Sequence, residues 1–260
     1  MHPHAETLWR GPRWTLAILL AVLGMLGPFS IDTYLPAFSG IASSLNASPV
    51  HMQQTLSAYL FGFAFMNLFH GALADSFGRR PVILWGLMAF TLASLGCALA
   101  QNVTQLIVFR AMQGLSCGAG VVVSRAIVRD IFPPTQAQKV MSQITIFFGL
   151  APAIAPIMGG WLFVSLGWHS IFWLLTAIGL ALWAVNFKML PESLHASQRQ
   201  PFSIPHLMRG YWQLCTDPRF LLLALASGIP FNGMFLYVLS APAFLGELLQ
   251  LQPTQFFWLF

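Results

Sequence analysis

The chain has 260 residues, of which 57% are hydrophobic and only 7% are charged. A soluble domain carries about 25% charged residues, so this composition excludes an ordinary soluble protein. The formal net charge is +5, from 12 Lys and Arg against 7 Asp and Glu. These cations are spread over separate polar connections instead of clustering with aromatic residues, and we therefore expect no binding to nucleic acid.

Long apolar runs dominate the chain and predict an all-α transmembrane fold. A bilayer core about 30 Å thick requires about 20 apolar residues in a helix. The first run is too long for the apolar part of a signal peptide, so we expect it to remain as a span. The predicted membrane-spanning helices cover residues 14–38, 52–74, 81–100, 104–127, 138–164, 168–190 and 219–244.

The last five residues, 256–260, are apolar and aromatic and predict the start of an eighth helix. A helix that stopped inside the membrane would leave carbonyl groups without partners. We therefore expect the sequence to be a fragment of a longer protein. It divides into a cytoplasmic tail (1–13), a six-helix bundle (14–190), a cytoplasmic connection (191–218) and the start of a second bundle (219–260).

A weak internal repeat supports two bundles. Residues 27–38 align with residues 233–244, and a Gly, a Phe, a Pro, an Ala and a second Phe coincide. The alignment gives the seventh span the role of the first, as in transporters built from parallel repeats. It places Val238 at the position of Asp32, so the acid is present in the first half alone.

Positive side chains fall on one side of the predicted membrane. Eleven of the 12 Lys and Arg residues lie in the N-terminal tail or in every second connection, and the alternate connections hold none. Such cations are retained in the cytoplasm, which predicts a cytoplasmic N-terminus. They are Arg10, Arg13, Arg79, Arg80, Arg125, Arg129, Lys139, Lys188, Arg199, Arg209 and Arg219.

Two ionisable residues inside predicted spans are the first candidates for function. Asp32 lies toward the outer end of the first span, and Arg110, the remaining cation, lies at a similar depth in the fourth. A charge at mid-membrane costs about 2.5–3.5 kcal/mol on insertion scales. We predict that Asp32 carries protons and that Arg110 tunes it, since a cation stabilises a carboxylate and desolvation favours the neutral acid. The alternative is a static ion pair that braces two helices.

Residues near these two groups are candidates for a substrate cavity. Met25, Phe29 and Tyr34 lie within about two turns of Asp32 on the first span. We assign Gln113 and Cys117 of the fourth span to the same cavity. Ordinary helix packing is the alternative for each of these residues.

The fourth and fifth spans carry helix-breaking and small residues at regular spacing. Gly114 and Gly118 follow Arg110 at four-residue intervals and predict a close approach between helices. In the fifth span, two prolines remove two backbone hydrogen bonds from one side of the helix and predict a bend. The alternative is close packing alone. This segment contains Pro152, Pro156, Gly159 and Gly160.

The turn between the second and third spans places opposite charges at the membrane surface. Asp75 lies on one side of Gly78, and Arg79 and Arg80 lie on the other. We predict that this cluster forms a conformational latch that joins the inner ends of two helices. Gly71 is assigned to the same latch because it lets a neighbouring helix approach.

Three segments make the chain similar to a known family. Residues 71–84 resemble the signature G-x-L-a-D-r-x-G-r-[KR]-x-x-[LI] of the major facilitator superfamily, with Ser76 in place of a basic residue. Residues 106–114 resemble its helix-four motif with an intramembrane arginine. Residues 151–160 resemble its helix-five antiporter motif, with Ala155 where most members have Gly. The segments 32–36 and 167–172 are similar to the bicyclomycin/chloramphenicol-resistance (Bcr/CflA) branch of drug:proton antiporters.

This resemblance, which covers Trp14 to Phe260, implies a twelve-helix protein of the bacterial inner membrane, and we expect it to be monomeric. Two bundles would rock around a central cavity and export small hydrophobic drugs against protons. It also implies that Asp75 partners a helix of the second half. We expect no enzymatic activity, no metal and no cofactor, since the proton gradient would drive transport. The alternatives are a facilitator for a metabolite such as an amino acid or sugar, and a non-transporting scaffold or sensor.

Overall fold

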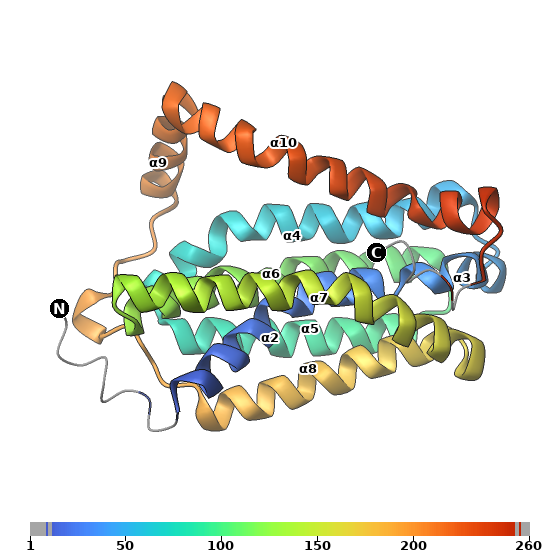
Figure 1. Cartoon of the computed structure of the whole chain (residues 1–260), viewed down its shortest axis with the longest axis horizontal. Coiled ribbons are helices and arrows are strands. Elements are labelled where there is room, and N and C mark those ends of the chain that lie inside the picture. The colour runs from blue at the N-terminus through green and yellow to red at the C-terminus, as the bar shows by residue number, and fades with distance from the viewer. Residues whose placement is uncertain (1–8, 10–11, 253–254, 256–260) are drawn as a thin grey trace.

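The structure, a computed structural model, describes residue 9, residues 12–252 and residue 255. Within these residues, seven helices are long and apolar enough to cross a membrane. The seven predicted spans coincide with them, while the predicted eighth helix at 256–260 lies outside the described residues. The spans lie lengthwise beside one another (Figure 1). They are α2 with α3 (Trp14–Ser44), α4 (Pro49–Phe77), α5 (Arg79–Ala98), α6 (Val103–Ile131), α7 (Pro134–Leu166), α8 (His169–Met189) and α10 (Pro218–Ala241).

The first span is broken directly after Asp32. Helix α2 (Arg13–Asp32) ends there, a 3-10 turn covers Leu35–Ala37, and α3 (Phe38–Ser44) completes the crossing. Pro36 has no backbone N–H and disfavours helical geometry at the residue before it. Pro28 lies inside α2 without ending it. The break therefore follows from Pro36, and it leaves Asp32 at a helix end.

Local signals fix the other helix ends. Ser48 accepts a hydrogen bond from the backbone N–H of His51 at 3.3 Å and begins α4, and Asn102 accepts one from Gln105 at 2.9 Å and begins α6. Gly78 and Gly167 adopt φ values of 104° and 81°, which favour glycine. They make the turns after α4 and α7 possible.

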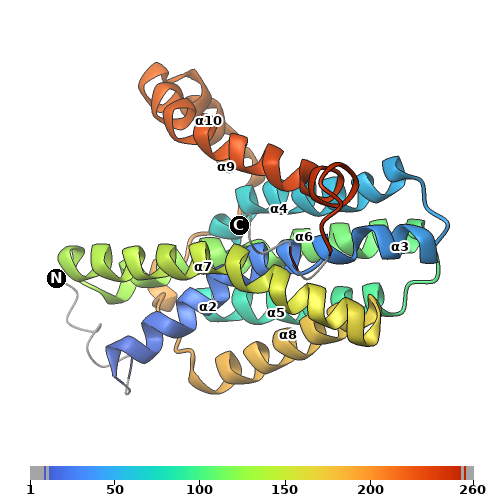
Figure 2. The same cartoon turned by 45° about the vertical axis from the view of Figure 1, so that its right-hand side comes forward.

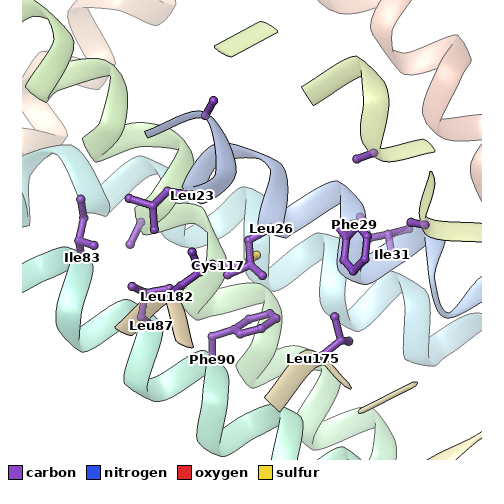
Figure 3. Close-up of a cluster of buried hydrophobic side chains, with 14 of the residues drawn as sticks. Leu23, Leu26, Phe29, Ile31, Ile83, Leu87, Phe90, Cys117, Leu175 and Leu182 are labelled. Atoms are coloured by element: carbon purple, nitrogen blue, oxygen red, sulfur yellow. The ribbon is translucent and has the colours of Figure 1, made fainter. Parts of the chain in front are cut away.

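Helix α6 is the centre of the bundle, with extensive contacts to α2, α4 and α5. A Cβ added to Gly114 would meet the carbonyl of Tyr59 on α4, so this glycine allows the two backbones to touch. That contact confirms the close approach predicted for the fourth span. Beside it, an apolar core joins α2, α5, α6 and α8 (Figure 3).

Helix α7 contains Pro152 and Pro156 and changes direction toward its C-terminal end at Leu166, as both views show (Figures 1 and 2). Each proline removes a backbone hydrogen bond and its ring displaces the preceding turn. The predicted bend is confirmed, and it brings α7 against the broken part of the first span.

The connection after α8 contains a 3-10 turn (Ala196–Gln198) and the helix α9 (Ile204–Thr216). Helix α10 follows and ends in a π-helical turn, η3, at Pro242–Leu248. In the 18-residue apolar stretch of α10, 6% is buried inside the structure, whereas 67% is buried in the corresponding stretch of the first span. Helix α10 therefore stands largely apart from the six-helix bundle, although Gln53 of α4 donates a hydrogen bond to the Leu239 carbonyl at 3.3 Å.

Candidate functional site

Asp32 is buried where four helices meet. Its exposed fraction is 3%, and it lines a cavity of about 40 Å³ between α2, α4, α7 and α10. The walls are apolar and aromatic, and the residues that line the cavity with Asp32 include Tyr59, Phe63, Phe148, Pro152, Phe235 and Val238. Val238 is the residue that the internal repeat aligns with Asp32, so the two halves of the repeat meet at this cavity.

Asp32 forms no ion pair with any cation that the structure describes. The alternative of a static pair between Asp32 and Arg110 is therefore not observed. Removing a carboxylate from water costs free energy unless a cation or donor compensates, and binding a proton removes the charge. An acid in these surroundings is suited to exchange a proton.

Arg110 is fully buried in α6, and its guanidinium lies between two aromatic rings. The guanidinium carbon is 4.6 Å from the ring centre of Tyr34 and 4.4 Å from that of Tyr59. Its Nη1 donates to the Gln113 side chain at 3.0 Å and to the Ser30 carbonyl at 3.3 Å. The rings stabilise the cation through their negative faces. Neither Nε nor Nη2 donates to a described residue.

Tyr59 connects the two charged residues. Its ring lies against the Arg110 guanidinium and also lines the cavity of Asp32. Its hydroxyl is 2.7 Å from Ser30 Oγ and donates to the Gly27 carbonyl at 3.0 Å. Ser30 precedes Asp32 by two residues, which places Arg110 and Asp32 at similar depth, as the sequence predicted. Tyr59 is not among the residues predicted from the sequence, where its signal is a phenol in an apolar span that requires a hydrogen-bond partner.

The five residues predicted to line the cavity lie elsewhere in the bundle. Phe29, Tyr34, Gln113 and Cys117 are buried in the bundle, and Met25 packs against that core. They are not among the residues that line the Asp32 cavity. The Tyr34 hydroxyl is 2.6 Å from Thr55 Oγ1, and Gln113 donates to Ser94 at 2.7 Å. In this structure they therefore support Arg110 and the surrounding core.

The helix-five residues support the break in the first span. Pro152 lines the Asp32 cavity, and Pro156, Gly159 and Gly160 are buried. A Cβ on Gly159 would collide with the carbonyl of Thr33, the residue after Asp32. The small residues of α7 thus allow its backbone to reach the point where α2 ends.

The predicted latch residues form a compact charged cluster at the basic end, the end of the bundle where α4 stops at Phe77 and α5 begins at Arg79. Arg79 Nη1 is 2.5 Å from Asp75 Oδ1, and Arg79 Nε is 3.0 Å from Asp130 Oδ2. Arg80 donates to the Phe187 carbonyl at 2.6 Å and thereby reaches α8. Gly71 was expected to allow a close approach, but a Cβ there would lie 3.9 Å from Val122, which is ordinary contact.

A model of the Major Facilitator Superfamily matches residues 11–260. The chain belongs to the Major Facilitator Superfamily. As an all-helical, multi-pass membrane protein, this superfamily member has the class of fold that its sequence motifs indicate.

Two curated relatives of this superfamily member are named for resistance to drugs. It is 38% identical over 221 residues to the bicyclomycin resistance protein homolog of Haemophilus influenzae, covering 85% of this chain and 56% of that protein. It is 36% identical over 175 residues to the multidrug resistance protein MdtL of Escherichia coli, covering 67% of this chain and 45% of that protein. The chain thus spans about half the length of these relatives.

Solved structures of transporters show the same fold. The human organic anion transporter MFSD10 has a TM-score of 0.64 at 21% identity, covering 95% of this chain and 70% of that one. A bacterial homolog of the human lysosomal transporter Spinster, in an inward-facing and unoccupied conformation, has a TM-score of 0.72 at 14% identity. It covers 98% of this chain and 58% of that one.

Two acids at the basic end of this superfamily member escaped the sequence analysis. Asp130, at the end of α6, is the second partner of Arg79. Glu192, after α8, accepts the backbone N–H groups of Arg79 and Arg80 at 2.9 and 3.3 Å, and so covers the start of α5. The sequence did offer a signal for these two partners, because the chain holds only 7 acidic residues. An acid beside a basic turn is expected to pair there.

Proposed function

We propose that this protein exports small hydrophobic, drug-like molecules across the bacterial inner membrane in exchange for protons, by alternating access. The observation that carries the proposal is Asp32, an acid with an exposed fraction of 3%, which faces an aromatic cavity and pairs with no described cation. The names of the relatives favour drugs as the cargo over a metabolite.

The coupling would arise from two states of the Asp32 carboxyl group. While the cavity is closed and apolar, the neutral acid is favoured, because a bare carboxylate would be desolvated. Opening toward water, or the arrival of a cationic cargo, stabilises the carboxylate and releases the proton. Arg110 would supply a fixed positive charge near α2, held in place by Tyr34 and Tyr59. No cofactor is needed, since the proton gradient supplies the free energy.

The size of the cavity supports alternation between conformations. A drug-sized ligand occupies a pocket of about 300–1,000 Å³, whereas the Asp32 cavity measures about 40 Å³. For cargo to bind at Asp32, the junction of α2, α4, α7 and α10 would therefore have to open. The break after Asp32 and the bend in α7 are the points where these elements can move with the least loss of backbone hydrogen bonds.

The remaining elements of the proposal are orientation and assembly. The basic end would face the cytoplasm, because cations near helix ends are retained there, and the N-terminus would lie on the same side. The latch of Asp75, Arg79 and Arg80 would then act at the inner surface, with Asp75 meeting a helix of the second bundle. The transporter would work as a monomer of the Bcr/CflA type.

Transport of a fluorescent cationic dye into everted vesicles that contain the full-length protein tests the proposal. We expect dye uptake that requires a proton gradient and that Asp32→Asn abolishes. Asp217→Asn, which removes an exposed acid just before α10, is the matched control and should leave uptake unchanged. Undiminished uptake by Asp32→Asn would remove this residue from the mechanism. A metabolite transporter would ignore the dye, and a scaffold would move nothing.

A further inference from the structure

Helices α4 and α5 both pack closely on α6 but contact each other much less. Between them lies a groove of about 360 Å³, a volume within the range of about 300–1,000 Å³ that drug-sized ligands occupy. Gly86 allows α5 to lie against α6, since a Cβ there would be 2.7 Å from the Cβ of Ala119. The lining of the groove includes Met66 and His70 of α4, Trp85 and Ala89 of α5, and Met112 and Ser116 of α6.

The groove is separate from the Asp32 cavity. The backbones of α4 and α6 are in contact at Gly62 and Gly114, and the groove and the cavity share no lining residue. The groove opens on the surface of the bundle, because Trp85 has an exposed fraction of 58% and Met112 one of 46%. Both residues lie inside membrane-spanning helices, where an exposed apolar side chain meets lipid. A ligand would therefore reach the groove from the lipid.

His70 is a buried polar residue in the wall of this groove. Its exposed fraction is 3%, and its Nδ1 has no hydrogen-bond partner among the described residues. Gly118 of α6 leaves room for it, since a Cβ there would lie 3.2 Å from His70 Nδ1. His70 lies seven residues before the end of α4 at Phe77, about 10 Å from the basic end. A buried polar atom without a partner costs free energy and marks a place for a ligand or water.

The lining residues define the chemistry of a ligand. Ser116, which also lines the groove, donates to the Met112 carbonyl of its own helix at 2.9 Å. A neutral imidazole offers one donor and one acceptor nitrogen, and a hydroxyl group can pair with either. No acid is among the described residues of the lining, so a cationic ligand would have no counter-charge. A lipid tail would fill the space but leave His70 without a partner.

We propose that the groove between α4, α5 and α6 binds small aromatic molecules that carry a hydroxyl group, such as phenols and aromatic alcohols, and that His70 is their hydrogen-bond partner. The aromatic body would lie between Met66, Trp85 and Met112. This site is additional to the proposed export through the Asp32 cavity, and its binding does not depend on proton coupling.

Photolabelling of the full-length protein in phosphatidylcholine vesicles tests the proposal. The probe is a trifluoromethyl phenyl diazirine with a hydroxymethyl group, and the comparison probe has a methyl group in its place. Mass spectrometry locates the adducts. We expect the hydroxymethyl probe to label Met66, Trp85 and Met112 saturably, and an excess of trifluoromethylbenzyl alcohol to remove this label. The methyl probe should bind about fivefold more weakly, as expected for the loss of one hydrogen bond.

Substitutions separate the hydrogen bond from the space. His70→Phe keeps an aromatic ring and removes both nitrogens, so the two probes should bind equally. His70→Asn keeps a donor and an acceptor, and it should retain a preference for the hydroxymethyl probe. Ala89→Trp fills the groove from an exposed position and should abolish saturable labelling. Leu92→Trp is the matched control on α5, because Leu92 is 58% exposed and does not line the groove.

Three outcomes would overturn the proposal. Labelling that rises in proportion to the probe and resists competition would show partition into lipid alone. Equal labelling by both probes that survives His70→Phe would assign the groove to lipid tails. Absence of adducts in the groove would mean that another part of the protein covers it. Asp32→Asn should leave the labelling unchanged, and dye transport is not measured, so failure here is distinguishable from failure of the proposed exporter.

Discussion

At the basic end, Arg79 lies 2.5 Å from Asp75 and 3.0 Å from Asp130, whereas in the membrane interior Asp32 and Arg110 form no ion pair with each other. In the first set, the cation Arg79 has two acids within contact distance. In the second set, the cation lies between two tyrosine rings and the acid faces an apolar cavity. The comparison indicates that paired charges at the basic end hold helices together, and that separated charges in the interior are available to change state.

The largest expected effect comes from Arg110→Met, which removes the interior cation. The substitution leaves the Gln113 side chain and the Ser30 carbonyl without their donor, so we expect the free energy of unfolding to fall by only about 1–3 kcal/mol. Dye transport should nevertheless fall to the level of empty vesicles. Thermal unfolding in detergent and vesicle transport measure the two quantities.

Arg110→Lys separates charge from shape in the same experiment. It keeps the positive charge but lacks the planar guanidinium that stacks between Tyr34 and Tyr59. We expect partial transport. Full transport by Arg110→Met would show that the interior cation has only a structural role. It would contradict the conclusion that the separated interior charges serve transport.

Gly159→Ala tests the contact between α7 and the break after Asp32. The added Cβ would meet the Thr33 carbonyl, and overpacking of this kind costs about 1–3 kcal/mol. Gly149→Ala is the matched control on the same helix, because its Cβ would meet nothing within 4 Å. It should be neutral or slightly stabilising, as alanine favours a helix. Equal unfolding temperatures for the two variants would contradict the contact.

Arg79→Gln tests the paired set. It leaves Asp75 and Asp130 without their cation, and we expect a loss of about 1–2 kcal/mol, because both acids are partly exposed and solvent screens the pair. The loss should shrink as salt is added. Arg199→Gln is the control, since its contact with Glu192 is longer, at 3.9 Å, and it should cost less. A salt-independent loss for Arg79→Gln would argue against an ion-pair role.

Glu192→Gln carries the smallest expected effect. The carboxylate accepts two backbone N–H groups at the start of α5, where a negative charge stabilises a helix by about 0.3–1 kcal/mol. The amide removes the charge and keeps only one acceptor oxygen for the two backbone N–H groups, so the free energy of unfolding should fall by about 1 kcal/mol. A larger loss, measured by thermal unfolding, would mean that Glu192 belongs to the paired network and does more than cap α5.

Sequence reasoning reached the spans because the hydrophobic thickness of a bilayer and its demand for internal hydrogen bonds are strong constraints. The break in the first span, the bend in α7 and the burial of Asp32 could be predicted from prolines and from a charge in an apolar run. The predicted cavity residues Met25 and Phe29 were chosen by distance along one helix. Which of their sides faces the cavity depends on neighbours that sequence spacing does not specify.

Composition and periodicity by themselves therefore determined that this protein crosses the membrane several times, where it does so, and that Asp32 and Arg110 lie inside it. Only the tertiary structure decided that these two charges are not paired, that Tyr59 lies between them, and that Asp130 and Glu192 complete the basic end. The physical reason is that crossing a membrane is decided within one helix, by the solvent around it. Whether two charges pair depends on how helices pack against each other, because an ion pair requires residues distant in the sequence to lie within a few ångströms.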